Sequence, residues 1–261
     1  MLIVLSPSKT LDFKSPLPTR KKSEPLFLER AAKLIANLQT LDADTIAEKM
    51  NVNQKLGTLN VERYQNWTLS LKNARPAILS FRGDVYLGLN PEAFNERDFT
   101  SAQRRLRILS GLYGILRPMD LIHPYRLEMG TSLRIADEKS LYEYWSTTIA
   151  DTLNSELSVH RKPIVVNLAS SEYFSPSVER LLNYRVIKCT FLDRYQDDYR
   201  FMSYFGKKAR GLLARHIIMN RSETISGIKA FNTDGYYFSP DRSTKDYLVF
   251  LRDNRPMDAS S

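Results

Sequence analysis

The chain has 261 residues, of which 43% are hydrophobic, so it is long enough to bury a substantial core and fold as a globular protein. Lys and Arg number 38 against 29 Asp and Glu. The net charge of +9 indicates an anionic partner: nucleic acid, an acidic membrane or a phosphorylated small molecule. One cysteine and three scattered histidines exclude a disulfide framework and form no metal-ligand pattern, so we predict no tightly bound metal and no cofactor.

The chain begins with a short apolar run, residues 1–5, which has no basic flank and ends before Pro7. This run is too short for a signal peptide or a membrane span, so we predict a cytoplasmic protein with no membrane partner. Residues 2–5 are typical of a buried strand. The sequence then predicts helices over 23–39, 41–50 and 53–67, followed by strands over 77–81 and 85–89 that are joined by a turn at Gly83-Asp84.

The second half of the chain alternates helices and strands. A capping pattern at Thr100 and Gln103 predicts a helix that ends near Leu109. Further helices are expected over 140–157 and 207–220, and strands over 163–168, 185–193, 199–205, 235–239 and 246–252. These elements interleave without regular βαβ periodicity, which favours a single α+β domain over 1–253, with a mixed sheet surrounded by helices. Residues 254–261 are polar and are expected to be a disordered tail.

Two stretches carry the positive charge. Residues 101–135 hold six arginines against two acidic residues, and residues 199–222 hold six basic residues and no acidic one. In the first stretch a helical wheel places apolar residues on one face and Arg104, Arg105 and Arg107 on the rest. The second stretch predicts a helix with an apolar face and a cationic face formed by Lys207, Lys208, Arg210, Arg215 and Arg221. Basic residues at the beginning of a helix oppose its dipole unless an anion binds there.

Two glycines follow the arginine-rich helix. Gly111 and Gly114 flank apolar residues between segments that can form helices, which is the composition of a helix-hairpin-helix turn over about 99–122. Glycine allows close approach of a phosphate to backbone N–H groups, and Arg117 adds positive charge nearby. The alternative interpretation is a helix that ends at a glycine cap and exposes an arginine-rich face to solvent.

A separate set of polar residues follows the predicted strands. Lys9 comes after the first strand, and Asn167 lies at the end of a later one, where sites form at sheet edges. Arg82 with Asp84 and Arg126 with Glu128 would share a face in an extended segment, so we predict a structural ion pair for each, with a role in a site as the alternative. If Lys9, Arg82, Arg126, Glu128 and Asn167 converge, they predict a polar pocket for an anion. No recognisable catalytic motif accompanies them, and the catalytic residues are unknown.

Six stretches together resemble the YaaA family of bacterial peroxide stress proteins. They are SPSKTLD at 6–12, FRGDVY at 81–86, the run from SGLYG at 110–114 through Arg117-Pro118 to PYRLEMG at 124–130, NLAS at 167–170, KKARG at 207–211, and Phe231-Asn232 with Gly235-Tyr236. The resemblance spans nearly the whole chain. It implies a cytosolic oxidative-stress protein associated with limiting free intracellular iron, with a compact fold, a positively charged cleft, a helix-hairpin-helix element and DNA-binding activity.

The sequence therefore leads to two hypotheses. In the first, the protein binds duplex or branched DNA without sequence specificity through the basic stretches, protecting DNA and limiting the effect of iron. In the second, it is an enzyme that acts on a nucleotide-like or phosphorylated small molecule in the polar pocket. The resemblance favours the first hypothesis.

Overall fold

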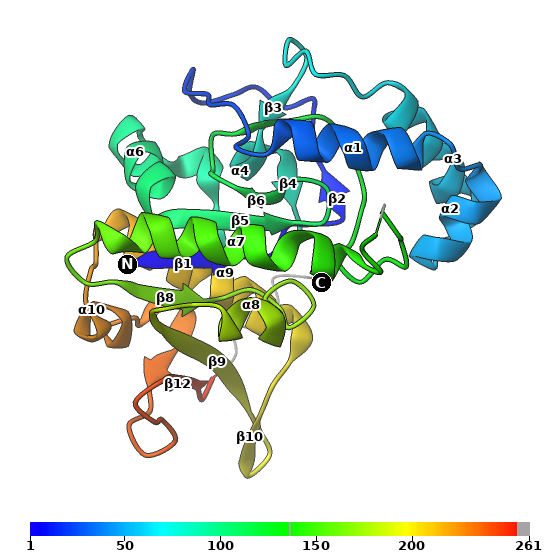
Figure 1. Cartoon of the computed structure of the whole chain (residues 1–261). Helices are drawn as coiled ribbons and strands as arrows, with labels where there is room; N and C mark the ends of the chain where they lie inside the picture. Colours follow the sequence, from blue (N-terminus) through cyan, green and yellow to red (C-terminus); the bar gives the residue numbers. More distant parts are fainter. Residues whose placement is uncertain (136, 255–261) are drawn as a thin grey trace.

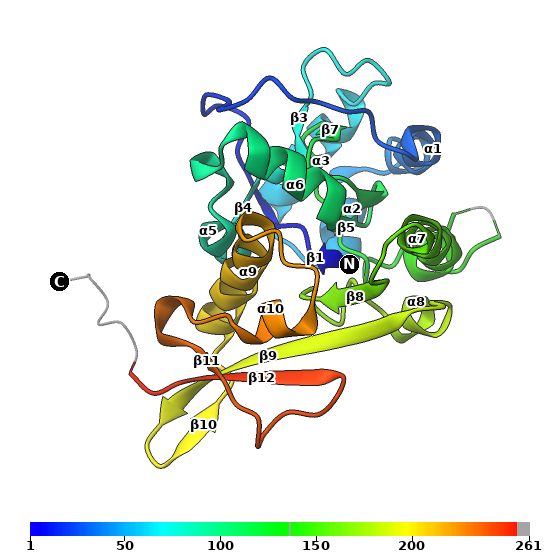
Figure 2. The same cartoon turned by 90° about the vertical axis from the view of Figure 1, so that its left-hand side faces the viewer.

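The computed structural model describes residues 1–135 and 137–254. It shows a mixed sheet with helices α7 and α8 on one face and α9 and α10 on the other (Figures 1 and 2). The order across the sheet is β11 (Tyr237–Phe238), β12 (Tyr247–Arg252), β9 (Arg185–Tyr195), β8 (Ile164–Asn167), β1 (Leu2–Leu5), β5 (Leu106–Ser110) and β6 (Gly114–Leu116), and β10 (Asp198–Arg200) pairs with β9.

The five central strands of this sheet, β12, β9, β8, β1 and β5, run parallel, and antiparallel partners lie at both ends. Strand β1 is in the middle, where Ile3 pairs with Leu106 on one side and Val166 on the other. All four side chains of β1 are fully buried. Burial on both faces explains why these strands are continuous apolar runs rather than alternating ones.

The helices pack around this sheet and over its β5–β6 end (Figure 1). In chain order they are α1 (Leu28–Leu38), α2 (Ala43–Met50), α3 (Gln54–Gln65), α4 (Ala77–Ser80), α5 (Asp84–Leu89), α6 (Glu96–Arg105), α7 (Leu141–Ser158), α8 (Pro176–Arg180), α9 (Ser203–Met219) and α10 (Ile225–Lys229), with 3-10 turns η1 (Pro91–Ala93) and η2 (Thr233–Gly235). Two small sheets pair β2 (Thr10–Leu11) with β4 (Phe81–Arg82) and β3 (Arg75–Pro76) with β7 (Leu121–Ile122). The α+β class predicted from the sequence is confirmed.

The helix-hairpin-helix prediction is wrong. Helix α6 begins at an Asn95–Asp98 capping box, earlier than the predicted cap at Thr100, and ends at Arg105. The chain then forms the antiparallel hairpin β5–β6, in which Ile108 pairs with Leu116. The run 106–110 is buried along its whole length, so its apolar residues fit a buried strand as well as a helix face.

The two glycines of this segment allow other parts of the chain to pack closely against it. A Cβ at Gly111 would overlap the carbonyl oxygen of Leu127. Gly114 adopts a φ of +71°, and a Cβ there would overlap the Trp145 ring. The backbone N–H groups of Leu112 and Tyr113 donate to the Ser110 hydroxyl at 3.2 and 2.9 Å. These N–H groups are therefore satisfied inside the protein and face no phosphate.

Residues 77–89 also differ from the prediction of two strands. Helices α4 and α5 occupy most of this segment, and only Phe81 and Arg82 form a strand. The apolar run is buried on all sides in α4, so periodicity could not distinguish a strand from a helix. Helix α9 begins at Ser203, four residues before the predicted start. The predicted tail lies outside the described residues, except for Asn254.

Candidate functional site

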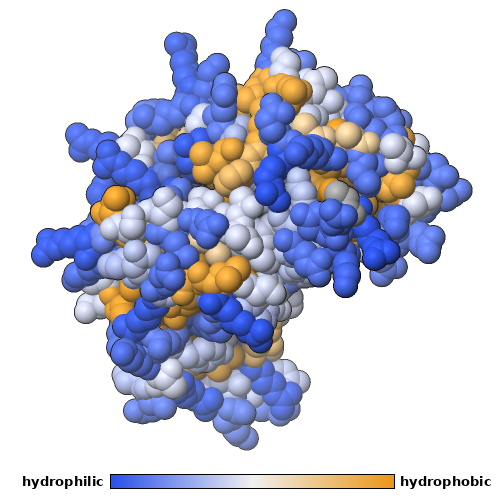
Figure 3. All heavy atoms as spheres, in the orientation of Figure 1, coloured by the Kyte–Doolittle hydropathy of each residue, from blue (hydrophilic) through white to orange (hydrophobic). Residues whose placement is uncertain are grey.

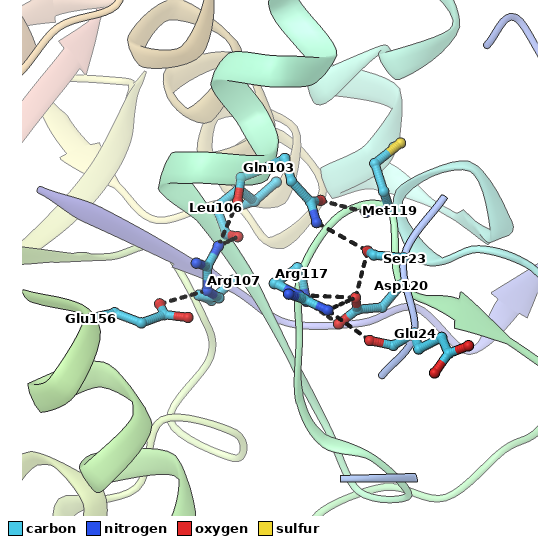
Figure 4. Close-up of polar contacts among 9 residues, drawn as sticks. All are labelled: Ser23, Glu24, Gln103, Leu106, Arg107, Arg117, Met119, Asp120 and Glu156. Atoms are coloured by element: carbon cyan, nitrogen blue, oxygen red, sulfur yellow. Dashed lines mark hydrogen bonds and ion pairs between the residues drawn. The ribbon is translucent and has the colours of Figure 1, made fainter. Parts of the chain in front are cut away.

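Two of the arginines predicted to bind DNA form ion pairs with carboxylates of the protein itself. Figure 4 shows Arg107 against Glu156, with an Nε–Oε2 distance of 2.7 Å, and Arg117 against Asp120, with an Nε–Oδ1 distance of 3.0 Å. Arg107 is 5% exposed, and Asp120 is fully buried. Burial raises the pKa of Asp120, and hydrogen bonds from Ser23 and Arg117 oppose this shift. Both arginines are held by these contacts; Arg107 is buried, whereas the Arg117 side chain is 28% exposed.

The basic residues around α6 form a different surface, which we call the α6 surface. Its members come from the loop before α1, from α6 and from the end of α9: Arg20, Lys21, Lys22, Arg97, Arg104, Arg105 and Arg221. They line three neighbouring hollows of about 580, 430 and 290 Å³ that share Lys21, with Arg104 common to the last two. In the view of Figure 3, hydrophilic side chains cover most of the face around α6.

Part of this charge is neutralised. Lys21 lies 3.2 Å from Glu96, Arg105 lies 2.5 Å from Glu223, and Arg221 lies 3.4 Å from Asp98. The remaining four residues of the α6 surface have no hydrogen bond from their side chains and no ion pair to any described residue: Arg20, Lys22, Arg97 and Arg104. All four are exposed. The surface is therefore concave, cationic and open to solvent.

The basic residues of α9 divide between three environments. Lys208 lies 3.4 Å from Asp234, and Arg215 donates to the backbone carbonyls of Leu89 and Asn90. Lys207 and Arg210 instead line a pocket of about 480 Å³ beside the carboxyl ends of β1 and β8. The single cationic face predicted for this helix is thus split by its neighbours.

We call this cavity the strand-end pocket. Its walls are residues 6–10 after β1, residues 83–86 at the beginning of α5, and four residues after β8, namely Leu168, Ser170, Glu172 and Tyr173. The Ser170 backbone N–H donates to the Ser6 hydroxyl at 2.9 Å, which ties the two strand ends together. The Tyr86 hydroxyl donates to the Ser6 carbonyl at 3.1 Å, and burial raises the pKa of Tyr86.

Three of the five predicted pocket residues converge. Lys9 lines the strand-end pocket, and its Nζ lies 3.1 Å from Glu128 Oε1. The same oxygen lies 2.9 Å from an Arg126 terminal nitrogen, so two cations share one nearly buried carboxylate. Lys9, Arg126 and Glu128 also line a small recess that shares Tyr173 and residues 7–9 with the pocket.

The other two predicted residues do not line the pocket. Arg82 pairs with Asp12 at 2.6 Å and with Glu92. Asn167 lies at the end of β8, where its side-chain oxygen accepts from the Ala169 N–H at 3.0 Å. Their contacts hold the loops that frame the pocket.

Sequence reasoning missed the part of the α6 surface that comes from the N-terminal loop. Arg20, Lys21 and Lys22 lie about 75 to 85 positions before α6 in the sequence, and a hydrogen-bond chain joins the two segments. The Gln103 amide donates to the Ser23 hydroxyl at 3.0 Å, and Ser23 donates to Asp120 at 2.7 Å (Figure 4). The cluster of three basic residues at 20–22 was the only available sequence signal.

Comparison with known proteins places the chain in a family. A curated UPF0246 protein from Cellvibrio japonicus (strain Ueda107) is 46% identical over 255 residues, which cover 97% of this chain and 99% of that protein. No helix within the described ranges is long and apolar enough to cross a membrane. Residues 1–242 match the family described as peroxide stress protein YaaA, and the chain belongs to this family.

Proposed function

We propose that this member of the peroxide stress family binds DNA through the α6 surface, without sequence specificity. The observation that carries the proposal is a set of four exposed cations without partners among the described residues, around three hollows that share Lys21: Arg20, Lys22, Arg97 and Arg104. Arginine and lysine on an open surface bind backbone phosphates and release counterions, and this contribution is independent of base sequence.

The proposed interface differs from the one predicted from sequence. It keeps Arg104 and Arg105, and it omits Arg107, Arg117, Gly111 and Gly114 because the fold occupies or buries them. It also omits Lys208, which pairs with Asp234, and Arg215, which donates to the carbonyl of Leu89 at the end of α5. The loop residues 20–22 and Arg97 take their place.

The proposal gives the protein an indirect relation to iron. DNA covered by protein is less accessible to oxidants that iron generates, so binding would limit the effect of free intracellular iron during peroxide stress. This role needs no iron ligands. Within residues 1–135 and 137–254, no three His, Cys, Asp or Glu side chains lie close enough together to hold a metal ion.

A pair of charge-matched variants tests the proposed interface. The first combines Arg97→Ala with Arg104→Ala, and the second combines Lys33→Ala with Lys55→Ala, which removes two exposed cations from α1 and α3. Fluorescence anisotropy with a labelled 20-base-pair duplex measures the affinity. We expect the α6 variant to bind more weakly and the control to bind almost as tightly as the parent. Equal losses in both variants would show that only net charge matters and would contradict the assigned surface.

A further inference from the structure

The strand-end pocket lies where the sheet reverses its order. The strand that follows β1 in the main sheet is β5, which lies on one side of β1. The strand that follows β8 is β9, which lies on the opposite side of the β1–β8 pair. Strands β1 and β8 are adjacent and parallel, with Val4 paired to Asn167. In open α/β sheets, ligands bind in the crevice at the carboxyl ends of two such strands. Ser6 and Ser170 lie at this position and both line the pocket.

The size of the pocket suits a small molecule. Its volume of about 480 Å³ is within the range of small-molecule sites, about 300 to 1,000 Å³. A DNA duplex is too wide to enter a cavity of this volume. The buried rings of Tyr86 and Tyr173 form an apolar part of the pocket wall, and the hydroxyls of Ser6 and Ser170 add polar groups to the lining.

Two cations in the pocket without partners in the described ranges indicate an anionic group on the ligand, and the carboxylates in the lining are Asp84 and Glu172. Lys207 and Arg210 project from one side of α9, three residues apart, and line the pocket. Among the described residues neither side chain has a hydrogen bond or a carboxylate partner. Burial lowers the pKa of Arg210, so its guanidinium has lost part of its hydration without gaining a counterion. An anion in the pocket would supply that missing partner.

The pocket lining also provides an acceptor. Glu172 lines the pocket, and its carboxylate has no hydrogen bond or ion pair with a described residue. A carboxylate can accept hydrogen bonds from the hydroxyl groups of a sugar. A ligand that carries both a phosphate and hydroxyl groups would provide partners for the two cations and for Glu172.

We propose that the strand-end pocket binds a phosphorylated sugar, free or as part of a nucleotide, with its phosphate on Lys207 and Arg210 and its hydroxyls toward Glu172. This site goes beyond the proposed DNA interface. Helix α9 has 17 residues and is about 25 Å long, and the pocket cations lie near its N-terminus, whereas Arg221 of the α6 surface follows its C-terminus. Both the strand-end pocket and the α6 surface would recognise phosphate. The test must therefore distinguish the phosphate of a small molecule from the phosphates of DNA.

Isothermal titration with adenosine 5′-monophosphate and with ribose 5-phosphate tests the site, with adenosine and ribose as probes that lack phosphate. We expect at least one phosphorylated probe to bind and its unphosphorylated counterpart to bind at least tenfold more weakly. Lys207→Ala and Arg210→Gln should each weaken phosphate-probe binding about tenfold, a loss of about 1.4 kcal/mol. Lys207 is exposed, so its substitution should leave the melting temperature unchanged even if Arg210→Gln affects folding.

Duplex DNA separates the two sources of phosphate. Arg97→Ala with Arg104→Ala should weaken DNA binding and leave probe binding intact, and Lys207→Ala should do the reverse. A 20-base-pair duplex should not displace the probe. The proposal is overturned if neither phosphorylated probe binds, or if Lys207→Ala leaves probe binding unchanged. It is also overturned if the duplex displaces the probe and Lys207→Ala weakens DNA binding equally, because these cations would then serve DNA.

Discussion

Gly88 of α5 and Gly211 of α9 let the two helices pack backbone against backbone. A Cβ at Gly88 would overlap the carbonyl oxygen of Lys208, and one at Gly211 would overlap the carbonyl oxygen of Val85. This contact sets the position of α9 and therefore places Lys207 and Arg210 beside the strand ends.

Gly211→Ala should destabilise the protein by about 1–3 kcal/mol, because the extra methyl group must push two helices apart. Urea unfolding followed by circular dichroism measures the change. Gly130→Ala is the control, since its Cβ would meet only ordinary contacts at 3.6 Å or more. Equal stability of the Gly211 and Gly130 variants would contradict the close helix packing.

Gly114→Ala distinguishes the observed hairpin from a phosphate-binding turn. Gly114 has a φ of +71° and lies against Trp145, so alanine should cost about 1–3 kcal/mol of folding free energy. DNA affinity of the folded variant should stay within about twofold of the parent. A variant of normal stability that loses DNA binding would favour the helix-hairpin-helix role instead.

The last strand is held by a buried ion pair. Arg252 Nε lies 2.6 Å from Asp193 Oδ1, and both residues are fully buried. Arg252→Met should cost about 3–5 kcal/mol because it leaves the Asp193 carboxylate buried without its cation, with only the Tyr236 hydroxyl donating to it. Adding Asp193→Asn should recover part of the loss. The exposed pair of Arg242 and Asp198, at 3.5 Å, is the comparison, and Arg242→Met should cost less than about 1 kcal/mol in the same unfolding experiment.

Cys189 should be inert in the native protein. Burial raises the pKa of its thiol to about 12, so at pH 8 a disulfide reagent should label it only after denaturation, at one thiol per chain. Because the folded pKa is above the unfolded value of about 8.5, the thiol's contribution to stability is complete below that pH and is lost as the pH rises toward 12. The parent should therefore lose stability faster than Cys189→Ala above pH 9. Rapid labelling of the native protein would contradict this prediction.

The sequence predicted those elements whose pattern is local. Helix α7 matches the prediction because Ser140 caps it and its apolar residues recur at helical spacing. Strands β8 and β9 match because both contain runs of β-branched and other apolar residues. Residues 106–116 and 77–81 are predicted wrongly because they are continuously buried, which removes the periodicity that separates helix from strand.

The candidate sites could be predicted only in part. Of the five residues predicted to converge on a pocket, Lys9, Arg126 and Glu128 do so, whereas Arg82 and Asn167 do not line it. The α6 surface depends on a long-range contact between the loop at Ser23 and Gln103, which no local pattern reveals. The separation of Lys207 from Lys208 depends likewise on what packs beside α9, namely the strand ends for one and Asp234 for the other.

The salt dependence of DNA binding tests the central claim most directly. If the four unpaired cations of the α6 surface each neutralise one phosphate, the logarithm of the association constant should fall against the logarithm of salt concentration with a slope of about −3.6. Removing Arg97 and Arg104 should reduce the slope to about −1.8, and removing Lys33 and Lys55 should leave it unchanged. A slope near zero in the parent, or the same slope in the Arg97 and Arg104 variant, would contradict the account.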